Sequence, residues 1–204
     1  AANFIRDTGL TPDQPVIALL PGSRRQELKR VIPVMEQIVR ACPQWQFVVA
    51  AVDNLKGEMY GSLPGLPNVK MVTDQTYDLL SVAKAAVVTS GTATLETALF
   101  RVPQVVVYKA SPGTYWVVKM IIQVPYISLV NLIAGREVVK ELIQDRCTPD
   151  HIIRELEHFV ESGARRHQVE ADYETIIQLL DAGGSASENT AAMMMKYLKK
   201  EQGA

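Results

Sequence analysis

The sequence predicts an α/β fold: a Rossmann-like parallel sheet of about six strands with helices on both faces, followed by C-terminal helices. Two observations lead to this prediction. Short apolar runs alternate with longer amphipathic runs, and the short runs are apolar throughout instead of alternating in polarity. Because a strand that is apolar on both sides must be covered on both sides, the sheet should be parallel, with helices on each face.

Five short runs have the length and the β-branched composition of buried strands, and Pro, Asp, Gly or Ser residues bound them. A sixth, weaker strand is expected around Tyr126–Val130. The five clear runs are Val16–Pro21, Phe47–Val52, Val69–Thr73, Ala85–Ser90 and Gln104–Lys109.

Helical patterns lie between these runs. Apolar residues from Leu28 to Val39 follow one helical face, although Pro33 should bend or restart this helix. Glu58–Leu63 predicts a helix only weakly. Better helical patterns are found at Tyr77–Ala83, Thr94–Leu99 and Tyr115–Ile122.

The character of the chain changes at about Thr148, where strands stop and helices follow one another. We therefore predict two units, a ligand-binding domain at 1–147 and a helical extension at 148–204 that packs on it. The helices expected in the extension are Ile152–Ser162, Ala164–Asp181 and Ala191–Lys200.

Charge and composition exclude several classes of protein. With 21 Lys and Arg residues against 22 Asp and Glu residues, the net charge is -1, which argues against a dedicated nucleic-acid binder. The two cysteines form no metal or redox motif, so we expect a reducing cytoplasm. The longest apolar stretch is interrupted by Lys119 and Pro125. It should not cross a membrane, which takes roughly 20 apolar residues.

Two loops that follow strands have the character of an anion site, since ligands of open parallel sheets lie outside the carboxyl ends of the strands. "PGSRR" contains Gly22, Ser23 and Arg24, and "SGTATLE" begins at Ser90. Each loop joins a glycine turn to a helix start, whose free N–H groups and positive dipole end favour an anion. Arg24 adds a bidentate cation suited to phosphate. The alternative is that Pro21-Gly22-Ser23 is an ordinary turn with a serine cap.

Three further polar residues allow two interpretations each. Glu96 lies one turn into the helix after "SGT" and could accept hydrogen bonds from a ribose diol, or simply favour the helix dipole. Asn131 and Arg136, in "NLIAGR", follow the expected sixth strand. They are either ligand contacts or parts of a polar turn and a helix cap.

The sequence lacks the motifs of several common nucleotide, hydrolase and metal sites. The sequence contains no G-x-G-x-x-G, no P-loop, no G-x-S-x-G, no Asp-x-Asp and no His/Cys cluster. The histidines, all in the expected C-terminal helices, are His151, His158 and His167. The loops therefore predict an anion site with no metal, no cofactor and no evident general base, which suits a diphosphate.

Three long motifs closely resemble the carboxyl-terminal half of lipid-A-disaccharide synthase, in order and in spacing. They are "LLPGSRRQEL", "VTSGTATLETALFRVPQVVVYK" and "YISLVNLIAGREVVKELIQ". The resemblance runs from about Val16 to Gln144, and the tail matches only in its helical character.

The resemblance implies one half of a two-domain GT-B enzyme, an inverting glycosyltransferase that needs no metal. The family transfers 2,3-diacylglucosamine from its UDP derivative to 2,3-diacylglucosamine 1-phosphate, giving lipid A disaccharide 1-phosphate and UDP. The implied partners are UDP, UDP-2,3-diacylglucosamine, an acceptor lipid bound through the amino-terminal domain, the cytoplasmic side of a bacterial inner membrane, and a second copy of the chain.

Roles in the family carry over to matching positions. Arg24 and Asn131 are the implied catalytic residues, and Glu96 should hold the ribose. The backbone around Thr73 should meet the uracil edge, and N–H groups of the "SGT" loop should face the phosphates. The whole implied donor site comprises Gly22, Ser23, Arg24, Thr73, Ser90, Gly91, Thr92, Thr94, Glu96, Asn131 and Arg136.

The chain departs from the family in two ways. Val130 stands where the family usually has a proline before the asparagine. The amino-terminal half, with the acceptor pocket and the expected carboxylate base, is absent from these 204 residues. We therefore expect a donor-binding fragment that is inactive alone.

Two other functions share this architecture. One is a UDP-sugar 2-epimerase, although such enzymes need acidic and histidine side chains at the cleft, and no histidine follows a strand here. The other is a non-catalytic domain that binds nucleotide sugars.

Overall fold

The computed structural model of the chain describes residues 2–53, 55, 57–111, 125–161 and 163–182. Within these residues six strands form one sheet in the order β3-β2-β1-β4-β5-β6, and every neighbouring pair is parallel. This is the strand order of the Rossmann fold. The strands are β1 Val16–Leu20, β2 Gln46–Ala51, β3 Val69–Thr73, β4 Ala85–Thr89, β5 Gln104–Tyr108 and β6 Glu141–Ile143.

The five clear strand predictions are confirmed, but the sixth was placed wrongly. No strand forms at Tyr126–Val130, where the helix α6 Leu129–Ala134 begins instead. The Ser128 side chain caps this helix by accepting a hydrogen bond from the Asn131 N–H, and a capped start commits the following residues to helix. The sixth strand is β6, which has only three residues, too few to produce a pattern in the sequence.

The helix α2 is continuous through Pro33, so the predicted restart does not occur. Pro33 cannot donate to the carbonyl of Lys29 one turn earlier, but both residues are exposed, so water can satisfy that carbonyl. Glu58–Leu63, the weak helix prediction, contains short 3₁₀ turns. The helices are α1 Ala2–Thr8, α2 Arg25–Ala41, α3 Thr76–Leu80, α4 Ala93–Leu99, α6 Leu129–Ala134, α7 Pro149–Val160 and α8 Ala164–Ala182.

The predictions for Tyr115–Ile122 and Ala191–Lys200 lie outside the described residues. Those for the helices that became α3, α4, α7 and α8 are confirmed to within a few residues, whereas α1 was not predicted. Among the described helices, none combines the length and the apolar character that crossing a bilayer requires.

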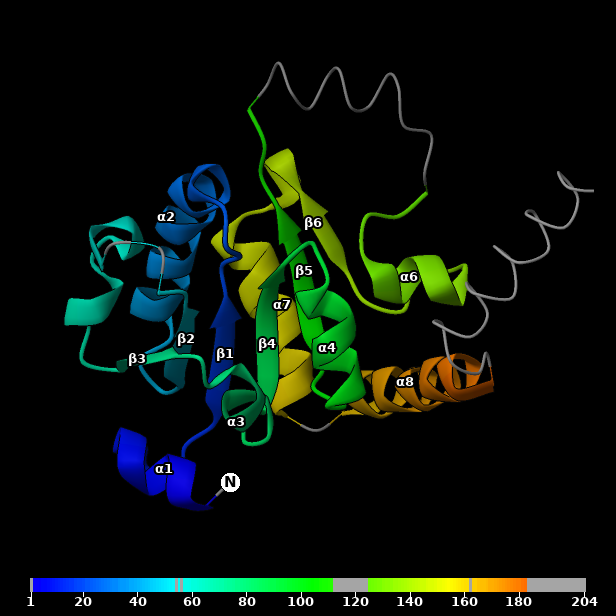
Figure 1. Ribbon diagram of the computed structural model, residues 1–204, viewed down its shortest axis with the longest axis horizontal. Helices are drawn as coiled ribbons and strands as arrows, with labels where there is room; N and C mark the ends of the chain where they lie inside the picture. Colours follow the sequence, from blue (N-terminus) through cyan, green and yellow to red (C-terminus); the bar gives the residue numbers. More distant parts are fainter. Residues whose placement is uncertain (1, 54, 56, 112–124, 162, 183–204) are drawn as a thin grey trace, which may run out of the picture.

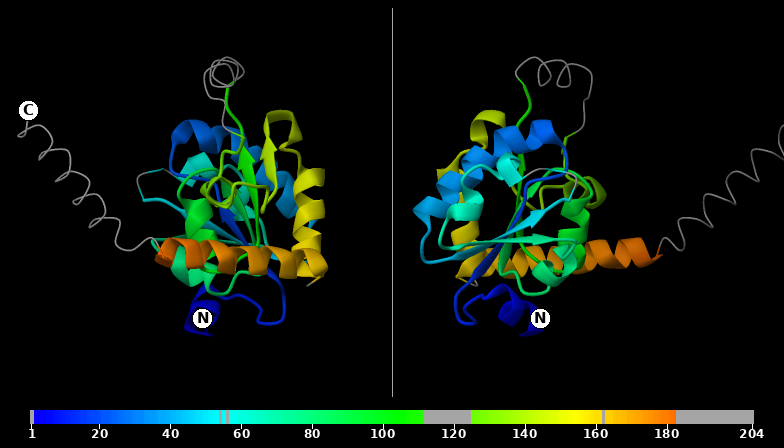
Figure 2. Two further views of the ribbon diagram at one scale, coloured as in Figure 1. Left: turned by 90° about the vertical axis from the view of Figure 1, so that its right-hand side faces the viewer. Right: turned by 60° about the vertical axis from the view of Figure 1, so that its left-hand side comes forward.

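Alternate residues of the strands face two separate apolar layers, as a doubly covered sheet requires. In β1, Ile17 and Leu19 pack with α2 and α7, whereas Ala18 and Leu20 pack with α1 and α3. The helices α4 and α7 contact β4 and β5, and Figure 1 shows them on opposite sides of these strands. Figure 2 shows α8 running across the end of the sheet, and its Tyr173 belongs to the same core as α7.

Strand order reverses between β1 and β4, because β1 leads outward to β2 and β4 leads outward to β5. The connections after these two strands therefore run to opposite sides of the sheet and leave a crevice between them. The fold thus brings together the two loops that the sequence singles out.

Candidate functional site

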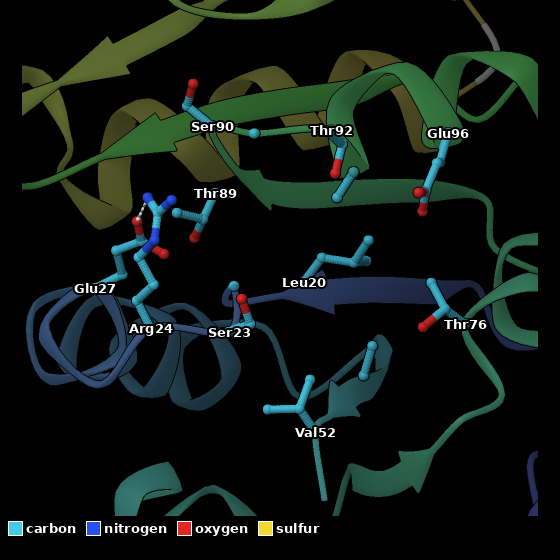
Figure 3. Close-up of a pocket in the computed structure, with 14 residues that line it drawn as sticks. Leu20, Ser23, Arg24, Glu27, Val52, Thr76, Thr89, Ser90, Thr92 and Glu96 are labelled. Carbon is cyan, nitrogen blue, oxygen red and sulfur yellow. Dashed lines mark hydrogen bonds and ion pairs between the residues drawn. The ribbon is translucent and has the colours of Figure 1, made fainter. Parts of the chain in front are cut away.

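A cavity of about 410 Å³ lies at the carboxyl ends of β1, β2 and β4. Figure 3 shows polar side chains at its two ends and Leu20 and Val52 between them. The lining consists of Leu20, Gly22, Ser23, Arg24, Glu27, Ala50, Val52, Thr76, Thr89, Ser90, Gly91, Thr92, Ala93 and Glu96.

The turn after β1 requires glycine at position 22. Its φ is 92°, in the left-handed region that side chains disfavour. A Cβ there would also lie 2.8 Å from the Glu27 Oε2 atom, so the Glu27 side chain would have to move aside. The turn therefore lets the carboxylate of the first turn of α2 fold back beside the backbone.

Arg24 occupies the N-cap position of α2, with an extended backbone (φ -99°, ψ 130°). Its Nη1 atom donates a hydrogen bond of 3.1 Å to the Glu27 Oε1 atom. The arginine side chain is 82% exposed, whereas that of Glu27 is 16% exposed. Glu27 thus holds one edge of the guanidinium and leaves the rest of it accessible to a ligand beside the start of a 17-residue helix.

The loop after β4 is fixed by Ser90. Its N–H donates to the Val107 carbonyl at 3.0 Å, and its Oγ atom donates to the Ile127 carbonyl at 2.8 Å. Because the Ser90 N–H is engaged, the N–H groups of this loop that can face a ligand are those of Gly91 and Thr92. Both residues are exposed and line the cavity.

The other end of the cavity carries Glu96 and Thr76. The Glu96 carboxylate has no hydrogen-bond or ion-pair partner within the described part of the chain, and it points from α4 toward the side of the cavity where Thr76 lies (Figure 3). Close to Arg24, Thr89 has a buried Oγ1 atom that also lacks a partner among the described residues. The cavity therefore presents a cation at one end and a free hydrogen-bond acceptor at the other.

Four of the predicted site residues do not line this cavity: Thr73, Thr94, Asn131 and Arg136. Thr94 is buried, and its hydroxyl donates to the Gly91 carbonyl at 2.7 Å, which shapes the loop from below. Thr73 is exposed at the end of β3. That these residues contact a donor stays a prediction.

Asn131 is fully buried and its amide is engaged on every side. Its Oδ1 atom accepts from the N–H groups of Val138 and Val139 at 2.8 and 3.0 Å. Its Nδ2 atom donates to the Val139 carbonyl and to the Glu141 Oε1 atom, both at 2.9 Å. The side chain thus ties α6 to the segment that leads into β6.

Arg136 forms a bidentate pair with Asp172 of α8, with N–O distances of 3.0 and 2.7 Å. The Asp172 side chain is 7% exposed and that of Arg136 is 55% exposed. The hydrogen bonds from Arg136 lower the pKa of Asp172, against the opposing effect of burial. This arginine joins the end of α6 to α8.

Replacing Arg136 by alanine should destabilise the chain by about 1–2 kcal/mol at neutral pH, because it leaves a buried carboxylate unpaired while water partly screens the lost pair. Since the pKa of Asp172 is lowered by folding, the pair stabilises the chain above the unfolded pKa of about 3.9 and loses this effect in acid. The loss in Arg136→Ala should therefore shrink as the pH falls. Urea unfolding at neutral and acidic pH measures it.

Arg101→Ala is the matched control, since Arg101 pairs with Glu174 of the same helix but both side chains are about half exposed. Its effect should be much the smaller of the two. An equal effect of the two substitutions, or a loss that grows in acid, would contradict the role assigned to Arg136. The affinity of the same variant for UDP tests the predicted donor contact separately.

Sequence reasoning missed several residues around the site. Glu27, Thr76 and Thr89 line the cavity, and Glu141 organises the turn before α6 by accepting from the N–H groups of Ile127 and Ser128. Only Glu27 left a signal, the three-residue spacing from Arg24 at a helix start. Among the described residues no three His, Cys, Asp or Glu side chains gather where they could hold a metal ion.

Comparison with known proteins points to one family. A family model described as lipid-A-disaccharide synthetase matches residues 2–195. The lipid-A-disaccharide synthase of Syntrophus aciditrophicus is 37% identical over 96% of this chain and 53% of its own length. That of Geobacter sulfurreducens is 36% identical over 95% of this chain and 52% of its own length. The chain thus spans about half the length of the relatives it matches.

Solved structures show the same fold. The calicheamicin glycosyltransferase CalG4 has a TM-score of 0.54 at 22% identity, over 93% of this chain and 45% of its own. Heptosyltransferase II of E. coli has a TM-score of 0.54 at 15% identity, over 79% and 51%. The UDP-GlcNAc 2-epimerase of Neisseria meningitidis has a TM-score of 0.54 at 14% identity, over 88% and 48%. The chain therefore has the fold of one half of a GT-B protein, as the sequence predicts.

Proposed function

Because the chain belongs to the lipid-A-disaccharide synthetase family, we propose that it is the donor-binding half of an inverting glycosyltransferase. The reaction is transfer of 2,3-diacylglucosamine from UDP to 2,3-diacylglucosamine 1-phosphate, which yields lipid A disaccharide 1-phosphate and UDP. The observation that carries the proposal is the cavity at the strand-order reversal, with Arg24 at one end and the unpaired Glu96 at the other.

The diphosphate lies between the two loops. Arg24 donates to phosphate oxygens from one side, and the N–H groups of Gly91 and Thr92 donate from the other. Charge grows on the leaving UDP as the bond to the sugar breaks, so donors fixed in advance stabilise that state more than the starting one. Glu27 keeps the guanidinium in place without occupying all its donors.

The nucleoside lies toward Glu96. An ionised carboxylate accepts hydrogen bonds from the two ribose hydroxyls, as acids do in other nucleotide sites. Glu96 also lines a neighbouring space with Asp74, Gln75 and Thr76, which directly follow β3, and this supports a uracil position near the backbone of 72–74. Val52 and Leu20 form the apolar floor under the nucleotide.

The reaction also needs groups that lie outside the donor cavity. A general base and the pocket for the acceptor lipid come from the other half of the enzyme, and no metal or cofactor takes part. Asn131 acts on catalysis by holding the segment before β6 in place. Contact with the inner-membrane surface and homodimer formation are further predictions from the family.

Calorimetric titration of UDP into the chain tests the proposal. Binding should occur at micromolar to millimolar concentration, and Glu96→Gln should weaken it about tenfold, since hydrogen bonds to a charged acceptor contribute about 1.5–3 kcal/mol. Glu58→Gln, which alters a carboxylate outside the cavity lining, is the control and should bind like the unmodified chain. Absence of heat at millimolar UDP would contradict the proposal. So would a Glu96→Gln variant that binds UDP as tightly as the unmodified chain.

A further inference from the structure

A second hollow adjoins the donor cavity on the other side of Arg24. It runs between the first two turns of α2 and the residues that follow β5, as two neighbouring spaces of about 270 and 590 Å³. Arg24 and Glu27 line both this groove and the donor cavity, so the two spaces adjoin each other at this ion pair. We call it the basic groove, and its charged lining is Arg24, Arg25, Glu27, Arg30, Lys109 and Asp145.

Positive charge in the basic groove is not balanced by the residues that the structure describes. Glu27 is already bonded to Arg24, which leaves Asp145 as the remaining acid. Within the described residues, the side chains of Arg25, Arg30 and Lys109 form no ion pair or hydrogen bond. Lys109 is half-buried as well. Cations that gather in a concave surface focus a positive potential there and repel one another until an anion binds.

The wall of the groove is held in place from the edge strand. The Ala110 N–H donates to the Gln144 Oε1 atom at 2.8 Å, and the Gln144 Nε2 atom donates back to the Ala110 carbonyl at 3.3 Å. This reciprocal pair fixes the backbone next to Lys109. Lys109 therefore follows an anchored strand end and lines the same space as Arg30 of a long helix, which is how a preformed site is built.

We infer that the basic groove binds a phosphate monoester, the one carried by the sugar that accepts the transferred unit. The inference rests on the proposed function, and it assigns only the phosphate of the acceptor to this half, while the pocket for the rest of the acceptor stays in the other half. In a β-1,6 transfer, the attacking 6-hydroxyl lies at the donor sugar, and the 1-phosphate lies across the acceptor ring from it. A monoester carries a charge of about -1.5 to -2 near neutral pH and three acceptor oxygens, which match two arginines and a lysine.

The test uses the chain saturated with UDP and titrated with glucosamine 1-phosphate, with glucosamine as the probe that lacks the phosphate. Amide chemical shifts are followed by NMR. Glucosamine 1-phosphate should shift the amides around 30 and 109–110, and glucosamine should not. Arg30→Gln and Lys109→Gln should each weaken binding about fivefold or more, as for a charged hydrogen bond partly exposed to water. Lys29→Gln removes the same charge from the neighbouring position of α2 and should leave binding unchanged.

The outcomes separate this inference from the proposed function. If UDP binds but glucosamine 1-phosphate does not, or if Lys29→Gln weakens it as much as Arg30→Gln, the inference is overturned and the donor site stands. If UDP itself fails to bind, the donor site fails first. Binding of phosphatidylglycerol vesicles through Arg30 and Lys109, without binding of the sugar phosphate, would also overturn the inference in favour of a membrane contact.

Discussion

Replacing Asn131 by alanine should destabilise the folded chain by about 2–5 kcal/mol, because two buried N–H groups lose their acceptor and each unsatisfied donor costs about 1–3 kcal/mol. These donors are the backbone N–H groups of Val138 and Val139, and both residues are fully buried. Urea unfolding followed by circular dichroism measures the loss. Few other single polar substitutions in the chain should cost as much.

Leu132→Ala is the matched control, since the neighbouring side chain is 40% exposed and should cost far less. Equal stability of Asn131→Ala and the unmodified chain would contradict the bonding described for the amide. The comparison also matters for function, because weaker UDP binding by an Asn131 variant indicates a lost donor contact only if the stability of the folded chain is unchanged.

Replacing Arg24 by alanine should weaken UDP binding by about tenfold to a hundredfold, since a charged hydrogen bond to phosphate is worth about 1.5–3 kcal/mol. The stability of the folded chain should hardly change, because the side chain is 82% exposed and surface ion pairs contribute little. Calorimetry and urea unfolding of the same preparation measure the two quantities.

Arg40→Ala is the control, since it also removes one positive charge from α2. Arg40 lies in the last turn of the same helix, where it donates to the Ser62 hydroxyl at 2.9 Å, far along α2 from the cavity. It should bind UDP with unchanged affinity. If Arg24→Ala binds UDP as tightly as Arg40→Ala does, the phosphate site lies elsewhere.

Much of the fold could be predicted from the sequence, because buried parallel strands leave uninterrupted apolar runs. β2 at Gln46–Ala51 and β5 at Gln104–Tyr108 are examples, and both are central enough to be covered on two faces. The same runs place the two cavity loops, since a loop directly after a buried strand has to lie at one edge of the sheet.

The edge strand β6 and the partners of Asn131 and Arg136 could not be predicted. β6 has three residues and a mixed composition, so it carries no periodicity. Asn131 bonds to residues seven and eight positions later, and Arg136 bonds to a residue 36 positions later. Such contacts depend on how α6 and α8 pack, which local patterns do not encode.

The same limit explains which cavity residues the sequence revealed. Gly22 and Arg24 belong to a glycine turn at a helix start, a local pattern that is typical of anion sites and can be read from the sequence. Thr89 ends β4, and Thr76 begins α3 after β3, so the two reach one cavity only through the strand order β3-β2-β1-β4. Threonine is common at such positions, so neither residue stands out in the sequence before the sheet brings the two together.

A crystal structure of the chain with UDP bound tests the central claim most directly. It should show the diphosphate between Gly22–Arg24 and Gly91–Thr92, with the ribose hydroxyls within hydrogen-bond distance of the Glu96 carboxylate. UDP bound outside this cavity, or with its ribose turned away from Glu96, would contradict the account of the donor site.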